Sequence, residues 1–146
     1  MLNSMNRLAF LALLAFSAAA GSAFAHEIPS EVSVTAFVRP SGSTLALLVR
    51  APMKSLRDVD VPRRENGFLD IGRSDQALRD AAQLWISDFI ELYENGARLP
   101  KPRTAAVRVS LPSDRSFESF DAAAANLAGP PLPADTEIYW EQGLLD

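Results

Sequence analysis

Short stretches of alternating apolar and polar residues, separated by turn-forming residues, recur along the sequence. The first stretch runs from Glu31 to Val38, and the apolar run Thr44–Arg50 follows it after a turn at Arg39–Ser43. Alternation with a period of two is typical of a half-buried strand, so this region predicts a β-hairpin. One side of its first strand carries Val32, Val34, Ala36 and Val38, and the other carries Ser33, Thr35 and Phe37.

The middle of the chain changes from a helical to an alternating pattern. Apolar residues spaced three and four apart predict a helix from Ser74 to about Ser87, with Ser74 or Asp75 capping its first N–H groups. The next residues alternate and reach Asn95-Gly96, the strongest short hairpin signal. We therefore expect a strand over Phe89–Glu94, a tight turn and a short returning strand.

Further short elements complete the predicted domain. Residues 51–72 predict a loop-rich connection with a turn of helix near Met53–Leu56, and Thr104–Leu111 predicts another strand. A short helix is expected over Ser116–Leu127 and a last strand over Glu137–Trp140. Together these elements predict a mostly β, α+β fold: a small antiparallel β-sandwich-like domain with one or two short helices.

The N-terminal segment, residues 1–25, has the three parts of a secretory signal peptide. Arg7 precedes the apolar stretch Leu8–Phe16, and small residues lead to the A-x-A site Ala23-Phe24-Ala25. The uncharged stretch Leu8–Ala25 also reaches the lower length limit of a membrane-spanning helix, about 17 residues. Its second half is rich in Ala, Ser and Gly, so we favour cleavage over a retained anchor. The predicted location is the periplasm or the outer face of the cytoplasmic membrane.

Cleavage after Ala25 leaves residues 26–146 as one β-rich extracytoplasmic domain. The whole chain has a formal net charge of −4, and the signal peptide carries only a positive charge, so the mature domain is more acidic. Acidic domains repel nucleic acid, which excludes that class of partner. The chain has no cysteine, which excludes disulfides, thiol catalysis and cysteine-bound zinc.

Catalytic motifs are missing from the sequence. One histidine and no cysteine leave most nucleophile–base arrangements unfilled, and there is no G-x-S-x-G, H-E-x-x-H or phosphate-binding glycine loop. Carboxylates are plentiful, but sequence spacing does not give the separation in space that a glycosidase needs. We therefore predict a non-catalytic protein without a required cofactor.

His26 is the candidate metal-binding residue. Cleavage after Ala25 would make it the mature N-terminus, where its α-amine and imidazole form a chelate for Cu(II) or Ni(II). A site with two nitrogens and no second histidine would be weak. The alternative, a polar residue that merely follows the cleavage site, is favoured. A free periplasmic metal-binding module that uses His26 is the second functional hypothesis.

Several segments together resemble the extracytoplasmic N-terminal region of HupE/UreJ-type bacterial membrane proteins, and they span nearly the whole mature chain. They are His26–Ser30, Ala36–Val38, Leu47–Pro52, Arg57–Asp60, Leu78–Ala82, Ile90–Gly96, Val109–Phe117 and Gly129–Pro133.

The resemblance implies a β-rich outer domain that precedes a multi-helix membrane domain associated with nickel or cobalt uptake. In that family the metal-handling His and Asp residues lie in membrane helices, and no such helix exists in residues 26–146. The resemblance therefore implies an accessory or interaction domain, whose partner is the membrane domain of such a protein or another envelope protein. Since the last predicted strand lies close to Asp146, we also expect that the sequence is truncated at its C-terminus.

Overall fold

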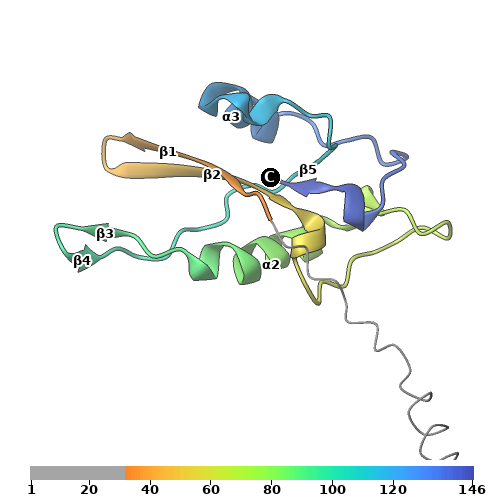
Figure 1. Cartoon of the computed structure of the whole chain (residues 1–146), viewed down its shortest axis with the longest axis horizontal. Coiled ribbons are helices and arrows are strands. Elements are labelled where there is room, and N and C mark those ends of the chain that lie inside the picture. Colours follow the sequence, from red (N-terminus) through yellow and green to blue (C-terminus); the bar gives the residue numbers. More distant parts are fainter. Residues whose placement is uncertain (1–31) are drawn as a thin grey trace, which may run out of the picture. The chain divides into compact units, whose positions relative to one another are not determined.

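The computed structural model describes residues 32–146, which form one compact unit (Figure 1). The predicted signal peptide and His26 lie outside the described residues. The unit is an α+β domain that contains a four-stranded antiparallel sheet, a two-stranded sheet and two short helices. This confirms the predicted fold class.

The four-stranded sheet has the order β1-β2-β6-β5. A two-residue turn, Gly42-Ser43, joins β1 (Thr35–Ser41) to β2 (Thr44–Pro52), which confirms the predicted hairpin. The strands β5 (Val109–Ser110) and β6 (Leu144–Leu145) are much shorter. β6 pairs with Ala51 and Pro52 of β2 on one side and with β5 on the other.

The second sheet is the predicted Asn-Gly hairpin in a shorter form. It joins β3 (Tyr93–Glu94) to β4 (Ala97–Arg98), and Asn95 and Gly96 have φ of +50° and +83°. Those angles suit the turn that matches the twist of a hairpin. The predicted strand from Phe89 is wrong at its start, because Ser87–Phe89 forms a 3-10 helix.

Two α-helices are described, α2 (Asp75–Trp85) and α3 (Phe120–Ala128). The prediction that Ser74 or Asp75 caps α2 is wrong, because the Ser74 hydroxyl donates to the Asp70 carbonyl and the Asp75 carboxylate accepts from Arg79. Ser119 caps α3 by accepting a hydrogen bond from the backbone N–H of Ala122 at 3.2 Å. The other short helices are of the 3-10 type: Met53–Ser55, Ile71–Arg73, Ser116–Glu118 and Trp140–Gln142.

The two helices lie on opposite sides of the four-stranded sheet (Figure 1). Phe37 and Arg39 of β1 mark the α3 side, since they contact Phe117 and Asp121. On the α2 side, Leu145 and its neighbour Val109 in β5 join one apolar core with Leu78 of α2. That core consists of Met53, Leu56, Val61, Leu69, Leu78, Ala81, Ala82, Val109, Ile138, Trp140 and Leu145.

Two features of the sequence pattern turn out differently in the structure. On β1 and the residues before it, Val32, Val34 and Val38 are exposed, whereas Phe37 on the other side is partly buried against Phe117. The side that looked apolar therefore lacks a covering layer. The predicted strand at Glu137–Trp140 is also wrong, because Trp140 begins a 3-10 helix and the strand comes later. Within residues 32–146, no helix has the length and apolar character needed to span a bilayer.

Candidate functional site

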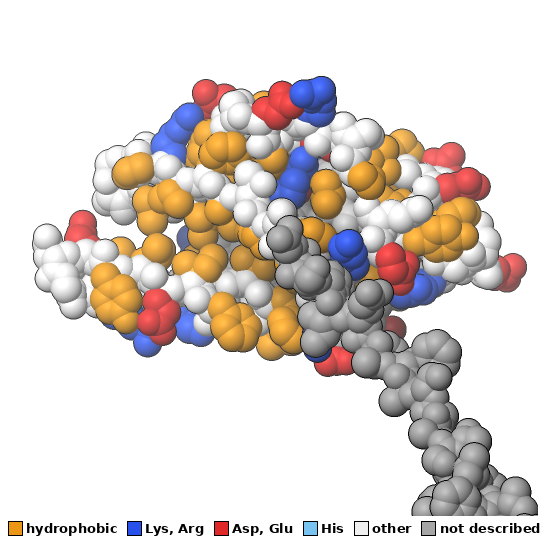
Figure 2. Space-filling model, in the orientation of Figure 1, with side chains coloured by type: hydrophobic (Ala, Val, Ile, Leu, Met, Phe, Trp, Pro, Cys, Tyr) orange, Lys and Arg blue, Asp and Glu red, His pale blue; other side chains and the backbone are white. Residues whose placement is uncertain are grey.

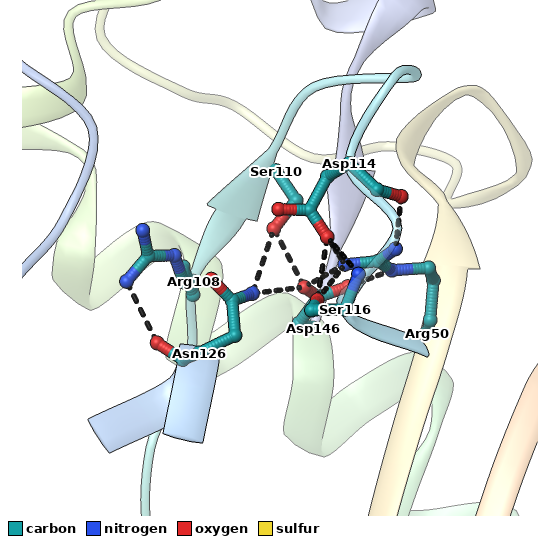
Figure 3. Close-up of polar contacts among 7 residues, drawn as sticks. All are labelled: Arg50, Arg108, Ser110, Asp114, Ser116, Asn126 and Asp146. Atoms are coloured by element: carbon teal, nitrogen blue, oxygen red, sulfur yellow. Dashed lines mark hydrogen bonds and ion pairs between the residues drawn. The ribbon is translucent and has the colours of Figure 1, made fainter. Parts of the chain in front are cut away.

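Six polar residues from distant parts of the chain meet beside β6 (Figure 3). At the centre of this buried polar cluster, Arg50 donates to both carboxylate oxygens of Asp146, from Nε at 2.6 Å and from Nη2 at 2.5 Å. The Asp146 side chain is fully buried, and that of Arg50 is 9% exposed. A bidentate ion pair of this kind fixes the orientation of the two side chains as well as the distance between them. The cluster consists of Arg50, Ser110, Asp114, Ser116, Asn126 and Asp146.

The remaining members of the cluster provide further hydrogen-bond partners for Arg50 and Asp146. Arg50 also donates to Asp114, at 2.9 Å to both its backbone carbonyl and its Oδ1. Ser110 Oγ and Asn126 Nδ2 donate to Asp146 Oδ2, at 2.6 Å and 3.2 Å. Burial opposes the charge on Arg50, but hydrogen bonds and attraction from Asp146 and Asp114 outweigh it and raise the pKa of the guanidinium.

Asp114 is ionised in this arrangement. Its burial acts to raise the pKa, but hydrogen bonds from Ser116 and Arg50 outweigh that effect and hold the pKa below its usual value. The Ser116 hydroxyl donates to Asp114 Oδ1 at 2.5 Å, and the Ser116 backbone N–H donates at 2.9 Å. The cluster is therefore a buried, hydrogen-bonded ion-pair network rather than a catalytic acid or base.

Next to the cluster, an open groove with a volume of about 770 Å³ runs along β2. Hydrophobic side chains line the hollow between the β1–β2 hairpin and the β3–β4 hairpin at the left of Figure 2. One long wall is β2 from Thr44 to Val49, and the other is segment 101–107, which precedes β5 and contains no helix or strand. Leu145 and Asp146 close the inner end.

The two helices supply the remaining apolar walls of the groove. Ala124, Leu127 and Ala128 of α3 line it on one side of the sheet. On the other side it is lined by residues at and after the end of α2: Ala82, Ile86, Ser87 and Ile90. The groove is therefore an apolar channel between helix layers, with the edge of β2 along one long wall and segment 101–107 along the other.

The residues singled out from sequence lie elsewhere. His26 is outside the described residues, so its metal-binding role stays a prediction. Within residues 32–146, no three His, Asp or Glu side chains come together as metal ligands. Sequence reasoning did not single out the polar cluster. The one available signal was the run Thr44–Arg50. Its unbroken apolar stretch, residues 45–49, indicates a strand that is covered on both faces, and an arginine at the end of such a strand needs a buried partner.

The chain matches no protein-family model, no curated protein and no solved structure. The resemblance to HupE/UreJ-type proteins therefore stays a prediction.

Proposed function

We propose that this chain is a non-catalytic extracytoplasmic domain that binds a partner polypeptide of the cell envelope through the groove. The observation that carries the proposal is the groove itself, an apolar channel that opens between the β1–β2 hairpin, the 101–107 segment and both helix layers. Open apolar surfaces of this kind mark interaction sites in soluble domains. The resemblance to HupE/UreJ-type proteins suggests the partner: their membrane domain, or another envelope protein.

The charged groups around the groove support binding rather than catalysis. Its titratable lining residues are Lys101, Arg103 and Asp146. Asp146 is held by Arg50, and Lys101 contacts Asp88 at 3.3 Å. Acid–base catalysis needs a group that is free to exchange a proton with a substrate. None of these three side chains forms a nucleophile–base pair, so the lining suits recognition of an apolar partner.

A photo-reactive residue in the groove tests this function. The cross-linker replaces Leu47, which lines the groove, or Glu65, an exposed residue that does not line it. We expect illumination of the source cells to join the chain to one membrane protein from position 47 and not from position 65. Equal products from both positions, or none from position 47, would contradict the proposal.

A dye experiment on the purified mature chain gives an independent check. A dye that fluoresces on apolar surfaces should bind the chain, and Leu47→Arg should reduce its signal because a charge enters the groove. Val38 is the matched control, since it pairs with Leu47 across the hairpin but is 60% exposed and does not line the groove. Val38→Arg should therefore leave most of the signal.

A further inference from the structure

One long wall of the groove is the unpaired edge of a strand, and the other is the segment that leads into β5. β6 pairs with β2 only at Ala51 and Pro52, so the part of β2 from Thr44 to Arg50 has β1 on one edge and the groove on the other. Across the groove, residues 101–107 lead directly into β5 and form no ladder of their own. The predicted strand over Thr104–Leu111 forms a ladder only at Val109 and Ser110 because its residues before Arg108 have no neighbour to pair with.

The direction of the backbone groups follows from the observed register. Ser41 and Thr44 close the two-residue turn, so β2 residues with even numbers bond to β1 and those with odd numbers point the other way. Met53 confirms this alternation, because its N–H donates to the Gly143 carbonyl at 3.0 Å. The backbone groups of Leu45, Leu47 and Val49 therefore point into the groove.

The opposite wall is suited to present matching groups. Arg108 exchanges two backbone hydrogen bonds of 2.9 Å with Asp146, so a strand that continued β5 back through residues 104–107 would place the N–H and carbonyl groups of Thr104 and Ala106 on the same edge. Among residues 32–146, the backbone groups of Leu45, Leu47, Val49, Thr104 and Ala106 form no hydrogen bond outside the β1–β2 ladder, and the register of that ladder turns the three β2 residues away from β1. Two facing edges with free donors and acceptors are the binding surface for a β-strand.

We propose that the groove binds one extended segment of a partner polypeptide, which inserts as a β-strand between β2 and residues 101–107. This inference rests on the proposed function and names the form of its partner. The inserted strand continues the line of β6, antiparallel to both walls, and its first residue lies opposite Val49 and Val107. Adjacent strands lie about 4.8 Å apart, and at β6 the two walls already accept one strand between them. About six residues fit before the strand passes Thr44.

The walls also determine which side chains the inserted strand needs. Its first and third residues lie on the side of Val49, Leu47 and Ile86, and its second lies on the α3 side near Leu48 and Leu127. A strand covered on both faces is apolar along its length rather than alternating. Its fifth residue lies opposite Arg103, which forms no ion pair with another described residue. An acidic residue there is complementary in charge.

A synthetic peptide tests the inference directly. The peptide Val-Leu-Val-Thr-Glu-Thr, with an acetylated N-terminus and an acidic solubility tail, is titrated into the mature chain and followed by calorimetry and amide hydrogen exchange. We expect saturable one-to-one binding. We also expect exchange to slow at Leu45, Leu47, Val49 and Ala106, because their N–H groups gain acceptors, with smaller changes at Ala46 and Leu48, which already bond to β1.

Two controls separate backbone pairing from apolar contact. The same peptide methylated on the backbone nitrogen of its third residue keeps its side chain but loses the donor to Leu47, and should bind about tenfold more weakly. Leu47→Arg should abolish binding, and Val38→Arg should leave it unchanged. The six residues joined directly after Asp146 provide a second measurement, since the attachment raises their effective concentration and should raise the Tm.

The outcomes distinguish this inference from the proposed function. Peptide binding without slowed exchange at the alternate β2 residues, or equal binding of the methylated peptide, would overturn strand insertion and leave the groove as an interaction surface. A peptide that does not bind when free and does not raise the Tm when attached after Asp146 would also overturn strand insertion. Cross-linking from position 47 would then show whether the proposed function survives. A chain that instead forms dimers through the groove would assign the site to a second copy.

Discussion

At the residue scale, Arg50 and Asp146 dominate the interior beside the groove. Removing one partner of a buried ion pair leaves an uncompensated charge away from water, which costs about 3–5 kcal/mol. We therefore expect Arg50→Met to lower the free energy of unfolding by about that amount, measured by urea denaturation. The exposed pair Arg115–Glu118 is the control, since Arg115→Met should change stability by less than about 1 kcal/mol.

The double variant sharpens the test of this pair. Arg50→Met combined with Asp146→Leu removes both charges of the pair, and it should be more stable than Arg50→Met alone because the fully buried carboxylate of Asp146 is no longer left without its partner, while Asp114 lacks Arg50 in both variants. If the double variant is instead the less stable of the two, the hydrogen bonds that Asp146 accepts from Ser110 and Asn126 contribute more to stability than its unpaired charge costs.

Asp114 should make stability depend on acid pH. Its pKa is lower in the folded chain than the ordinary value of about 3.9, so its stabilising effect is complete above that value and is lost as the pH falls through the folded pKa. We expect Asp114→Asn to lower stability by about 1–3 kcal/mol at neutral pH. Its unfolding free energy should also change less than that of the wild type below about pH 4.

The measurement is urea unfolding of both proteins between neutral pH and the acid range. The exposed carboxylates of Asp88 and Asp121 also have lowered pKa values, mainly through hydrogen bonds from Gln83 and Arg39. They are present in both proteins and contribute equally, so the difference between the two curves isolates Asp114. Parallel curves would mean that Asp114 titrates alike in the folded and unfolded chains.

At the scale of elements, local sequence patterns correctly predicted the elements that are stabilised by interactions between residues close in sequence. The β1–β2 hairpin, the Asn95-Gly96 turn and α2 depend on residues close in sequence, and all three are confirmed. The segments that depend on distant partners differ. Residues 104–108 have a strand pattern but no ladder partner over most of their length, and β6 is a strand because it lies between β2 and β5. The polar cluster joins residues up to 96 positions apart, which no local pattern indicates.

The buried face of β1 is a second feature that the local sequence pattern did not predict. Its valines alternate as the buried side of a strand would, yet Val38 is 60% exposed and Phe37 is the residue that packs inward. Alternation fixes which residues share a face, but the helix layer that covers one face is determined elsewhere in the chain. Here Phe117 and α3 cover the side of Phe37.

At the scale of the whole described unit, the apolar core lies at one end of the four-stranded sheet. Met53, Leu69, Ile138 and Leu145 are almost completely buried around β6, whereas the hairpin residues from Ala36 to Ala46 are exposed apart from Phe37. The far part of the hairpin therefore has one ladder, between β1 and β2, and little packing to support it. Regions of this kind open at a much lower free energy than a core.

Amide hydrogen exchange of the chain without any partner should show this gradient. We expect protection to fall along β2 from Ala51, which opens only with global unfolding at about 5–15 kcal/mol, to a low value at Thr44. Within that gradient the N–H groups of Leu45, Leu47 and Val49 should exchange faster than those of Ala46 and Leu48, because only the latter bond to β1. Equal protection of all β2 residues would mean that the backbone groups facing the groove already have hydrogen-bond partners. β2 would then have no free edge, and strand insertion depends on that edge.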